Sequence, residues 1–448
     1  MWDFKLYQNN IALIDDRGTE ITYRELEQKC DELYRKIGKR CLCFVLCRNS
    51  IDSIVAYTSL IQNNVVALLL SMNIDRGLLN NLLDLYKPSY IISDGEVSPF
   101  SNDNYDLYDN LALLLTTSGS TGSPKFVRQS YENISSNAKS IVEYLKLDKS
   151  ERPITSLPMN YTYGLSIINS HLMVGATICV TDHTLMQKEF WNFFKTMKCT
   201  SIAGVPYNYE ILDKLRFTRM DLPDLRYMTQ AGGKLSLELH KKFANYANDS
   251  NKRFVVMYGQ CEATARMGYL PPNMALSKIG SMGIAIPGGE FELIDVDGSI
   301  IKESDKEGEL RYKGDNVTLG YAESGVDLIK ADERNGILNT GDIAKRDLDG
   351  YYYITGRKKR FLKVYGNRVN LDELERLLKS HFNTELAIGG YDDHIYIFML
   401  KEDNNDSIKE YIEQITNLNR QAFHFKTITE IPHNESGKVL YNELNKLI

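Results

Sequence analysis

The stretch from Thr116 to Lys125 combines residue types that bind phosphate groups. It reads Thr-Thr-Ser-Gly-Ser-Thr-Gly-Ser-Pro-Lys and directly follows the apolar run Leu111–Leu115. A short buried strand that ends in glycine, serine and threonine exposes backbone N–H groups and hydroxyls, and Lys125 adds a positive charge. These groups together suit a polyphosphate, so the stretch is a candidate nucleotide loop. The alternative interpretation is a flexible glycine- and serine-rich surface turn.

The loop differs from the Walker A motif of P-loop kinases and GTPases. Gly122 is followed by Ser123 rather than by a lysine. The pair Gly437-Lys438 near the C-terminus is followed by Val439 instead of serine or threonine. A P-loop enzyme is therefore a poor fit.

The composition is that of an enzyme-sized globular chain without a charge signature for nucleic acid. The 448 residues are 43% hydrophobic, which allows two or three domains with large cores. The formal net charge is -6, and the basic residues are dispersed except at 357–363. The N-terminus lacks a signal-peptide pattern, and apolar runs such as Val65–Met72 are too short to span a bilayer. We expect a soluble, cytoplasmic protein with no membrane span and no nucleic-acid partner.

Cysteine and histidine show no pattern typical of a metal site. None of the seven cysteines forms a C-x-x-C pair, and Cys41, Cys43 and Cys47 lie in or beside an apolar segment, which favours buried structural thiols. The seven histidines are scattered singly, so no zinc-type cluster is visible. Any metal is expected to be a magnesium ion held by carboxylate and phosphate oxygens.

The elements that must position the loop follow an α/β pattern. Thr22 and Glu25 form a capping-box pattern within an amphipathic helical stretch at 20–36. Alternation of strands with longer periodic segments favours α/β layers around a mainly parallel sheet. The expected buried strands are Leu42–Leu46, Ile91–Ser93, Leu111–Leu115, Thr177–Thr181, Ser201–Gly204 and Phe254–Tyr258.

The pattern changes near residue 290. Short alternating strands at Glu290–Asp295, Glu309–Tyr312 and Tyr351–Ile354 are separated by Asp-Gly turns, which predicts antiparallel pairing. After the basic patch 357–360 the chain restarts with a helix at Val369–Leu378, a strand pair near 386–400 and a helix from about 407. We place a domain boundary at 357–360, followed by a small α+β domain.

Several separated motifs, in this order, resemble the adenylate-forming (AMP-binding) superfamily of acyl-CoA synthetases, carrier-protein-loading adenylation domains and luciferases. The resemblance covers almost the whole chain and implies a large N-terminal adenylation domain at 1–356, a hinge at 357–360 and a small mobile C-terminal lid domain at 361–448. The matching segments are Ala12–Asp15, Ile21–Leu26, Thr117–Lys125, Tyr258–Glu262, Thr340–Asp342, Gly350-Tyr351, Gly356-Arg357, Gly366–Val369 and Ser436–Lys438.

The resemblance implies a two-step ligase. A carboxylate attacks the α-phosphate of ATP to form acyl-AMP and pyrophosphate, and the thiol of CoA or of a carrier-protein phosphopantetheine then displaces AMP. Because two anions meet in the first step, the site needs cations and hydrogen-bond donors. The expected cofactors are ATP and magnesium, with CoA or a phosphopantetheine carrier as acceptor. The expected partners are a carboxylic acid substrate and a candidate separate acyl carrier protein.

The resemblance also assigns roles to residues that would hold the nucleotide and the metal. Glu262 matches the magnesium ligand, and with Lys125, Thr121 and Lys438 it belongs to the expected catalytic group. Asp342 and Arg357 match the ribose-binding pair. The other expected nucleotide-binding residues are Ser118, Gly119, Ser120, Gly122, Gly232, Tyr258, Gly259 and Cys261, of which Tyr258 would stack on the adenine.

Three further residues would serve a rotation of the lid domain. Lys438 matches the lysine that contacts the carboxylate and the phosphate during adenylation. Lys359 stands at the position of the hinge residue, and Gly366 belongs to the loop that would replace Lys438 for acyl transfer.

Two features depart from the family pattern or bear on the substrate. Cys261 stands where the family usually has threonine, and a thiol is a weak hydrogen-bond donor. Thr162 stands where amino-acid-activating members often have an aspartate, so a simple carboxylic acid is favoured over a free α-amino acid. The expected acyl-pocket residues are Tyr161, Thr162, Tyr163, Gly164, Tyr207 and Gly233, although these tyrosines equally suit a packed core.

Three alternatives to the thiol-acylating ligase stay open on the sequence. An amide-forming ligase would use an amine as the acceptor, and an amino-acid-adenylating enzyme would use a different acid. A catalytically weak nucleotide-binding scaffold is suggested by Cys261, whereas the presence of Lys125, Glu262 and Lys438 argues against it.

Overall fold

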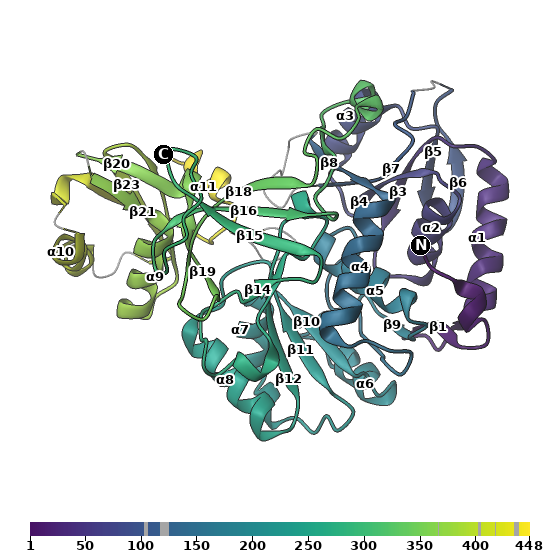
Figure 1. Cartoon of the computed structure of the whole chain (residues 1–448), viewed down its shortest axis with the longest axis horizontal. Helices are drawn as coiled ribbons and strands as arrows, with labels where there is room; N and C mark the ends of the chain where they lie inside the picture. Colours follow the sequence, from purple (N-terminus) through teal and green to yellow (C-terminus); the bar gives the residue numbers. More distant parts are fainter. Residues whose placement is uncertain (103–105, 117–124, 366, 402–404, 417, 434–438) are drawn as a thin grey trace. The chain divides into compact units, whose positions relative to one another are not determined.

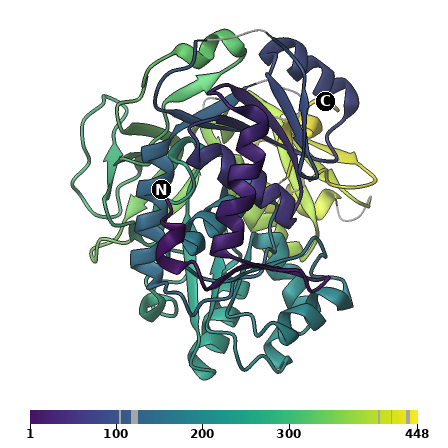
Figure 2. The ribbon, with the colours of Figure 1, turned by 90° about the vertical axis from the view of Figure 1, so that its right-hand side faces the viewer.

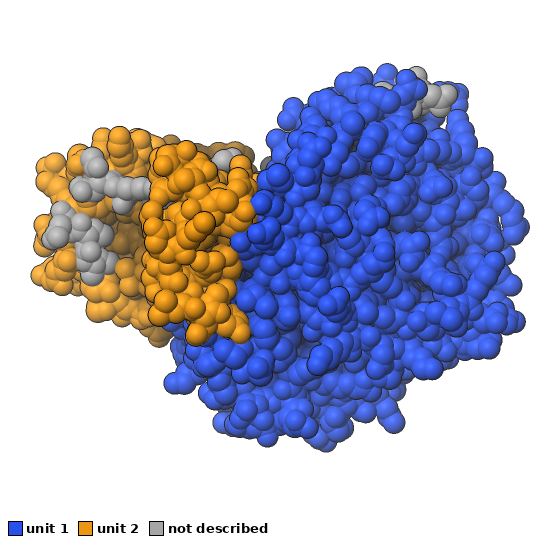
Figure 3. Space-filling model, in the orientation of Figure 1, with its two compact units in different colours: residues 1–291, 312–338 blue, residues 292–311, 339–448 orange. Residues whose placement is uncertain are grey.

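Two units make up the chain. The computed structural model describes residues 1–102, 106–116, 125–365, 367–401, 405–416, 418–433 and 439–448 (Figure 1). The first unit comprises 1–291 with 312–338, and the second comprises 292–311 with 339–448 (Figure 3). Both combine sheets with flanking helices, so the expected α/β class is confirmed.

The main sheet of the first unit has seven strands in the order β17-β8-β7-β4-β3-β5-β6. Strands β7, β4, β3 and β5 run parallel, whereas β8 and β17 at one edge and β6 at the other pair antiparallel. The parallel centre agrees with the sequence prediction, and the antiparallel edges were not predicted. The strands are β3 (Leu42–Cys47), β4 (Val66–Ser71), β5 (Tyr90–Ser93), β6 (Glu96–Pro99), β7 (Leu111–Thr116), β8 (Phe126–Ser130) and β17 (Gly320–Ala322).

Helices cover both faces of this sheet, which explains why its central strands are apolar on both sides. Helix α2 (Ile51–Gln62) packs on β3 and β4, and α1 (Tyr23–Ile37) packs on α2. In Figure 2, α1 lies in front of the sheet. Helix α3 (Arg76–Tyr86) shares a core with the opposite faces of the same strands.

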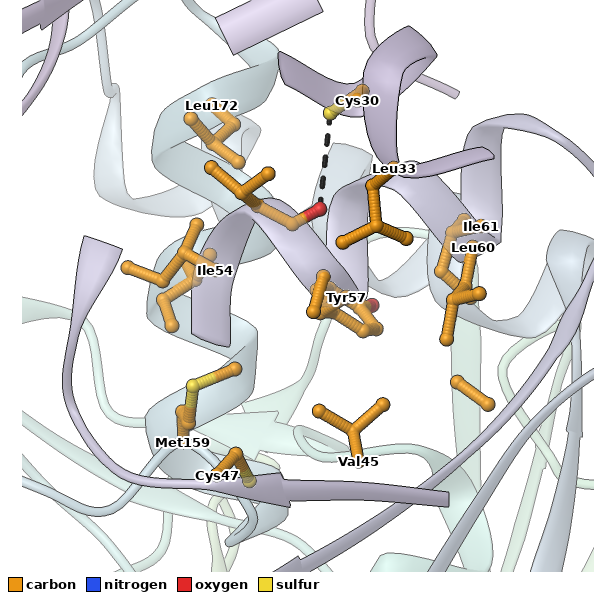
Figure 4. Close-up of a cluster of buried hydrophobic side chains, with 14 of the residues drawn as sticks. Cys30, Leu33, Val45, Cys47, Ile54, Tyr57, Leu60, Ile61, Met159 and Leu172 are labelled. Atoms are coloured by element: carbon orange, nitrogen blue, oxygen red, sulfur yellow. Dashed lines mark hydrogen bonds between the residues drawn. The ribbon is translucent and has the colours of Figure 1, made fainter. Parts of the chain in front are cut away.

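The core beneath α1 and α2 brings together residues from well-separated segments. Figure 4 shows Val45 and Cys47 of β3 facing a cluster that includes Ile54 and Tyr57 of α2. The Cys30 thiol of α1 donates to the Val55 carbonyl oxygen at 3.8 Å. Helix α1 begins at the predicted capping box, in which Thr22 and Glu25 bond each other's backbone.

A second sheet carries the elements that lead to the candidate site. Its order is β10-β11-β12-β13-β14, with the first three strands parallel and the others antiparallel. Helices α4 (Tyr131–Leu145) and α5 (Thr162–Met173) contribute side chains to the cores of both large sheets and so form a shared layer. The strands are β10 (Ser201–Gly204), β11 (Tyr227–Gln230), β12 (Arg253–Tyr258), β13 (Gly268–Tyr269) and β14 (Ile284–Ala285).

The remaining elements of the first unit complete these layers. Helices α7 (Pro206–Lys214) and α8 (Leu237–Asp249) pack on the second sheet, where Tyr209 and Phe243 meet at 4.8 Å between ring centroids. Beyond them lie α6 (Lys188–Thr196) and a small sheet of β2 (Glu20–Thr22), β1 (Ile11–Asp15) and β9 (Ile178–Val180).

The second unit combines three groups of strands with helices, and the segment 361–448, predicted as a separate small α+β domain, lies within it. One sheet has the order β15-β16-β18-β19, a hairpin joins β20 to β21, and a third sheet is β22-β23-β24 with α9 packed on β22. The predicted hinge at 357–360 begins at the last residue of β19 and stays a prediction. The elements are β15 (Gly289–Ile294), β16 (Gly308–Gly314), β18 (Ile337–Arg346), β19 (Tyr352–Arg357), β20 (Phe361–Val364), β21 (Asn367–Asn370), α9 (Leu371–Phe382), β22 (Leu386–Tyr391), β23 (His394–Met399), α10 (Asn405–Thr416), β24 (Phe423–Thr427) and α11 (Tyr441–Asn445).

All seven cysteines are buried free thiols, in agreement with the structural role expected from the sequence. Within the described ranges, no three histidine, cysteine or acidic side chains gather closely enough to hold a metal ion. None of the described helices combines the length and the apolar composition needed to cross a bilayer.

Candidate active site

The carboxylate of Glu262 lies in a short 3-10 turn, Cys261–Ala263, that follows β12. Ligands of open α/β sheets bind beyond the carboxyl ends of parallel strands, and β12 is such a strand. One oxygen of Glu262 accepts a hydrogen bond from the Tyr321 hydroxyl at 2.8 Å. Within the described part of the chain the Glu262 carboxylate forms no ion pair, so its negative charge is available to a cation.

The turn that carries Glu262 is held in a strained conformation. Thr264 has φ 64° and ψ -60°, and the Ala265 amide donates to the Ala263 carbonyl at 2.7 Å across it. This γ-turn is rare, and a positive φ at a β-branched residue costs about 1–3 kcal/mol. Such strain persists where surrounding contacts fix it, and it occurs often at functional sites.

Residues 316–318 supply those contacts. The Asn316 side-chain amide donates to the carbonyl oxygens of Ala263 and Arg266, each at 2.9 Å. The Thr264 hydroxyl donates to the Asn316 carbonyl at 2.8 Å. Thr318 donates to the Glu262 carbonyl through its amide at 3.0 Å and its hydroxyl at 2.9 Å. The turn is therefore fixed from the segment that precedes β17.

Tyr321 on β17 joins Glu262 to two cationic side chains. The Lys125 ammonium lies 3.9 Å from the centre of the Tyr321 ring, and the Arg334 guanidinium lies 4.6 Å from it. Burial, and next the negative charge of Glu262, raises the pKa of the Tyr321 hydroxyl, which therefore stays protonated and donates. Sequence analysis did not single out Tyr321 or Arg334. No local signal marks them, because the pairing of Tyr321 with Val127 of β8 links distant segments.

We expect Tyr321→Phe to lower acid-dependent turnover about 10- to 100-fold, because a hydrogen bond to a charged group contributes about 1.5–3 kcal/mol and its loss frees the Glu262 carboxylate to reorient. The magnesium concentration needed for half-maximal rate should rise in the same variant. The measurement is the initial rate of pyrophosphate release across a magnesium titration. Tyr353→Phe is the matched control, since the Tyr353 hydroxyl bonds Asp347 at 3.2 Å in the second unit. An unchanged magnesium dependence in Tyr321→Phe would contradict the positioning role.

The predicted phosphate loop is described only at its ends. Ser118, Gly119, Ser120, Thr121 and Gly122 lie outside the described residues. Strand β7 ends at Thr116 and the antiparallel β8 begins at Phe126, and these two residues are paired. Lys125 is described, and its ammonium lies 3.9 Å from a carboxylate oxygen of Glu323.

Two glycines expected beside the nucleotide, Gly232 and Gly259, are described, and both occupy positions that disfavour a side chain. A Cβ on Gly259 would lie 1.7 Å from the Ala265 carbonyl oxygen. Only glycine therefore allows the backbone at 259 to approach Ala265 this closely. Gly232 has φ 85°, a left-handed conformation that favours glycine. The Tyr258 hydroxyl accepts a hydrogen bond from the Gln260 amide at 3.3 Å, and the Tyr258 ring lies 6.2 Å from that of Phe291.

The expected acyl-pocket residues Tyr161 to Gly164 lie at the start of α5, against the Glu262 turn. The Thr162 hydroxyl donates to the Thr264 carbonyl, and the Tyr161 and Tyr163 rings meet edge-on at 6.3 Å. Gly164 touches the backbone, since a Cβ there would lie 2.2 Å from the Pro158 carbonyl oxygen. Burial raises the pKa of Tyr161 and Tyr163, so both hydroxyls stay neutral.

Tyr207 and Gly233 lie on or beside α7 rather than at the start of α5. Tyr207 is 47% exposed on α7, whereas Tyr209, two residues later, is fully buried and donates to the Thr229 carbonyl at 2.9 Å. Gly233 is close to α7, with an added Cβ 3.0 Å from the Pro206 side chain. The structure therefore brings Tyr161–Gly164 to the Glu262 turn and leaves the roles of Tyr207 and Gly233 as predictions.

We expect Cys261→Thr to raise the adenylation rate about twofold to tenfold, because a hydroxyl is a better donor than a thiol and a neutral hydrogen bond contributes about 0.5–1.5 kcal/mol. Cys261 is buried, and threonine has a similar size. Cys261→Ser carries a hydroxyl donor and Cys261→Ala carries none. Comparing these two small side chains separates the effect of the hydrogen-bond donor from the effect of side-chain volume. A threonine variant no faster than the alanine variant would contradict a role for this side chain as a phosphate donor.

In the second unit the structure brings the predicted ribose-binding pair together. Asp342 of β18 and Arg357 of β19 are register partners in an antiparallel pair. The Arg357 Nε atom lies 3.4 Å from an Asp342 carboxylate oxygen, with Asp342 buried and Arg357 exposed. The pair joins a buried carboxylate of β18 to an exposed guanidinium on the edge strand β19.

Arg360 anchors the chain directly after the predicted hinge residue Lys359. Its guanidinium bonds Asp372 at 2.7 Å and Glu375 at 3.2 Å, and it stacks on the Tyr441 ring at 3.6 Å. Only the backbone of Lys359 is described, within a 3-10 turn, and Gly366 and Lys438 lie outside the described residues. Arg360 is fixed to helices α9 and α11 of the second unit. A backbone rotation at Lys359 would therefore not extend past Arg360.

Residues 98–322 match the family model described as AMP-binding enzyme. The chain belongs to the AMP-binding enzyme family. It is 26% identical over 362 residues to luciferin 4-monooxygenase of Nipponoluciola cruciata, covering 77% of this chain and 65% of that protein. It is 27% identical over 382 residues to 2-succinylbenzoate–CoA ligase of Staphylococcus aureus, covering 82% of this chain and 74% of that protein.

Solved structures of this family share the fold. The o-succinylbenzoate coenzyme A synthetase of Bacillus subtilis, in complex with ATP and magnesium, superposes with a TM-score of 0.81 at 22% identity and covers 98% of each chain. The matched parts span less than two thirds of the length of several curated family members, such as 65% of the luciferin 4-monooxygenase. The superfamily predicted from the motifs is confirmed by these matches.

Proposed function

We propose that this protein is an ATP- and magnesium-dependent carboxylate ligase that forms an acyl-adenylate and transfers the acyl group to a thiol. The observation that carries the proposal is Glu262, a carboxylate without an ionic partner among the described residues, held by Tyr321 beside Lys125 at the carboxyl end of a parallel sheet. Membership of the AMP-binding family, with CoA ligases among its relatives, supports the same reaction.

Both steps balance without a further reactant. In the first, an oxygen of the substrate carboxylate bonds to the α-phosphorus of ATP as the bond to the β-phosphate oxygen breaks, which releases pyrophosphate. In the second, a thiol sulfur bonds to the acyl carbon as the acyl–oxygen bond to AMP breaks, and the thiol proton passes to solvent. AMP and a thioester are the products.

The residues present fit a magnesium ion. Magnesium is usually held by one or two carboxylates together with substrate phosphates and water, and Glu262 offers one carboxylate with an oxygen that no described residue bonds. Bound there, the ion would offset negative charge on the phosphates. Lys125 would add a second positive charge, and Tyr321 would keep the Glu262 carboxylate aimed.

The roles of the second unit follow from the proposal. Asp342 and Arg357 would bind the ribose hydroxyls, and Lys438 would reach the reacting carboxylate and the α-phosphate during the first step. Rotation at Lys359 would then bring the Gly366 loop forward for acyl transfer. A free α-amino acid is a less favoured substrate, because Thr162 provides no carboxylate for an α-ammonium group.

The test of the function is pyrophosphate release in the presence of ATP, magnesium and hydroxylamine, which traps the adenylate as a hydroxamate. The panel contains short, medium and long fatty acids, aryl acids, dicarboxylic acids and amino acids. Acid-dependent release together with the matching hydroxamate is the expected result. ATP binding without release for any acid would contradict the ligase and favour a nucleotide-binding scaffold.

The acceptor is identified by mass spectrometry of the products formed with CoA, with a phosphopantetheinylated carrier protein, or with amines. We expect a thioester. A thioester that forms with the carrier alone would contradict CoA as the acceptor, and an amide as the main product would contradict the thiol-acylating reaction.

A further inference from the structure

Three arginine side chains are buried in the part of the chain that the structure describes, and one of them lacks a carboxylate. Arg128 pairs with Glu333 at 2.5 Å. Arg360 pairs with Asp372 and with a second carboxylate. Arg266 is only 2% exposed, and among the described residues it contacts no carboxylate. An ionised group buried without an opposite charge costs several kcal/mol, so this arrangement needs a compensating partner.

The contacts that Arg266 does form are neutral. Its Nε donates to the Ser166 hydroxyl at 3.2 Å, and its Nη1 donates to the Tyr144 hydroxyl at 3.0 Å and to the Met257 sulfur at 2.6 Å. The guanidinium lies 4.4 Å from the centre of the Tyr163 ring. Its Nη2 has no acceptor among the described residues, so the N–H donors of this nitrogen are not used within that part of the chain.

Arg266 contacts a residue of the expected acyl pocket. Tyr163 and Ser166, which it contacts, belong to the first turns of α5, and Arg266 follows Glu262 by four residues, just beyond the turn Cys261–Ala263. The contact with Tyr163 therefore sets the guanidinium beside a residue of the expected acyl pocket.

A small cavity adjoins the guanidinium. Its described lining includes Arg266 with the polar side chains Ser170, His171, Ser201, Tyr227 and Thr229, and it includes no acidic residue. Burial lowers the pKa of His171 to about 4, so this imidazole is neutral near pH 7. The buried carboxylate of Glu151 is already paired, with Arg226 at 3.2 Å. Arg266 is thus the charged member of the described lining.

We propose that Arg266 binds a second anionic group of the acid substrate, so that the preferred substrates are dicarboxylates. This inference rests on the proposed function and names the substrate class of the same site. A carboxylate can accept two parallel hydrogen bonds from a guanidinium, which gives both charge compensation and orientation. The second carboxylate of the substrate would supply the negative charge that Arg266 lacks among the described residues.

The test compares dicarboxylates with monocarboxylates of the same carbon skeleton, namely glutarate with pentanoate, adipate with hexanoate and isophthalate with 3-methylbenzoate. Acid-dependent pyrophosphate release is measured for wild type, Arg266→Met, Arg266→Lys and the control Arg253→Met. Arg253 also lies over a tyrosine ring, that of Tyr227 at 5.0 Å, and among the described residues its guanidinium bonds a single backbone carbonyl, that of Leu145.

We expect wild type to prefer at least one dicarboxylate over its partner by about 10²-fold in kcat/KM, because leaving a buried charge unpaired has a cost of that order. Arg266→Met should lose this preference by lowering the dicarboxylate rate about 10²-fold while the monocarboxylate rate stays within about threefold. Arg266→Lys should keep part of the preference, and Arg253→Met should keep all of it.

A second measurement does not depend on turnover. The melting temperature of wild type should rise more with a dicarboxylate than with its monocarboxylate partner, and this difference should vanish in Arg266→Met. Equal rates and equal melting shifts for both acid types in wild type would overturn the anionic subsite. Release with monocarboxylates alone would overturn it while supporting the ligase. Release with no acid, but a melting shift specific to dicarboxylates, would contradict the ligase and support the subsite.

Discussion

Lys438→Ala is expected to lower acid-dependent pyrophosphate release about 10²–10³-fold while leaving ATP binding nearly unchanged. The loss follows from removing a positive charge that would act on the reacting carboxylate and the α-phosphate in the transition state, by analogy with a lost oxyanion donor. The measurement pairs the rate of release with the ATP dissociation constant from calorimetry. The acyl-transfer step, measured from pre-formed acyl-AMP, should be affected much less, because Lys438 is proposed to leave the site before that step.

Lys446→Ala is the matched control, because Lys446 is an exposed lysine near the same terminus whose ammonium bonds Glu443 at 2.7 Å. It should behave as wild type. An adenylation rate in Lys438→Ala within about threefold of wild type would contradict the assigned role. Equal losses in adenylation and in acyl transfer would contradict the exchange of Lys438 for the Gly366 loop.

Glu262→Gln is expected to lower adenylation about 10²-fold or more and to weaken the response to magnesium. The substitution removes the charge that would bind the metal, and a metal ion typically contributes several kcal/mol to a transition state with developing charge. The amide oxygen of glutamine can still accept the hydrogen bond from Tyr321, so the turn and the folded state should be retained. The measurement is the magnesium dependence of pyrophosphate release, with circular dichroism as a check on folding.

The control for this variant is Glu238→Gln, which removes an exposed carboxylate in the first turn of α8. It should leave the magnesium dependence unchanged. If Glu262→Gln keeps both the wild-type rate and the wild-type magnesium midpoint, the metal is held elsewhere and the Glu262 assignment is wrong.

The sequence was most informative where function and local structure coincide. The capping box of Thr22 and Glu25 begins α1 as predicted, and Asp342 and Arg357, predicted as a pair, are register partners on β18 and β19. The strand that ends at Tyr258 runs directly into the Glu262 turn. These features depend on short segments whose pattern can be recognised from the sequence without knowledge of the tertiary contacts.

Features that depend on long-range contacts escaped prediction. The apolar run Val65–Met72 was interpreted only as too short for a bilayer, whereas it contains β4, a central strand of the main sheet. Tyr321 reaches Glu262 only because β17 pairs with β8, and Asn316 fixes a turn about fifty residues earlier in the chain. The missing counter-ion of Arg266 is a property of its buried surroundings, which no sequence pattern reports.

The most direct test of the ligase is ATP–pyrophosphate exchange, in which labelled pyrophosphate enters ATP only if the adenylate forms reversibly on the protein. The assay needs no thiol acceptor, so it isolates the first step. We predict exchange that requires an acid and magnesium and that falls about 10²–10³-fold in Lys438→Ala. Exchange that is absent for the whole acid panel, although ATP binds, would contradict the claim that this chain forms acyl-adenylates.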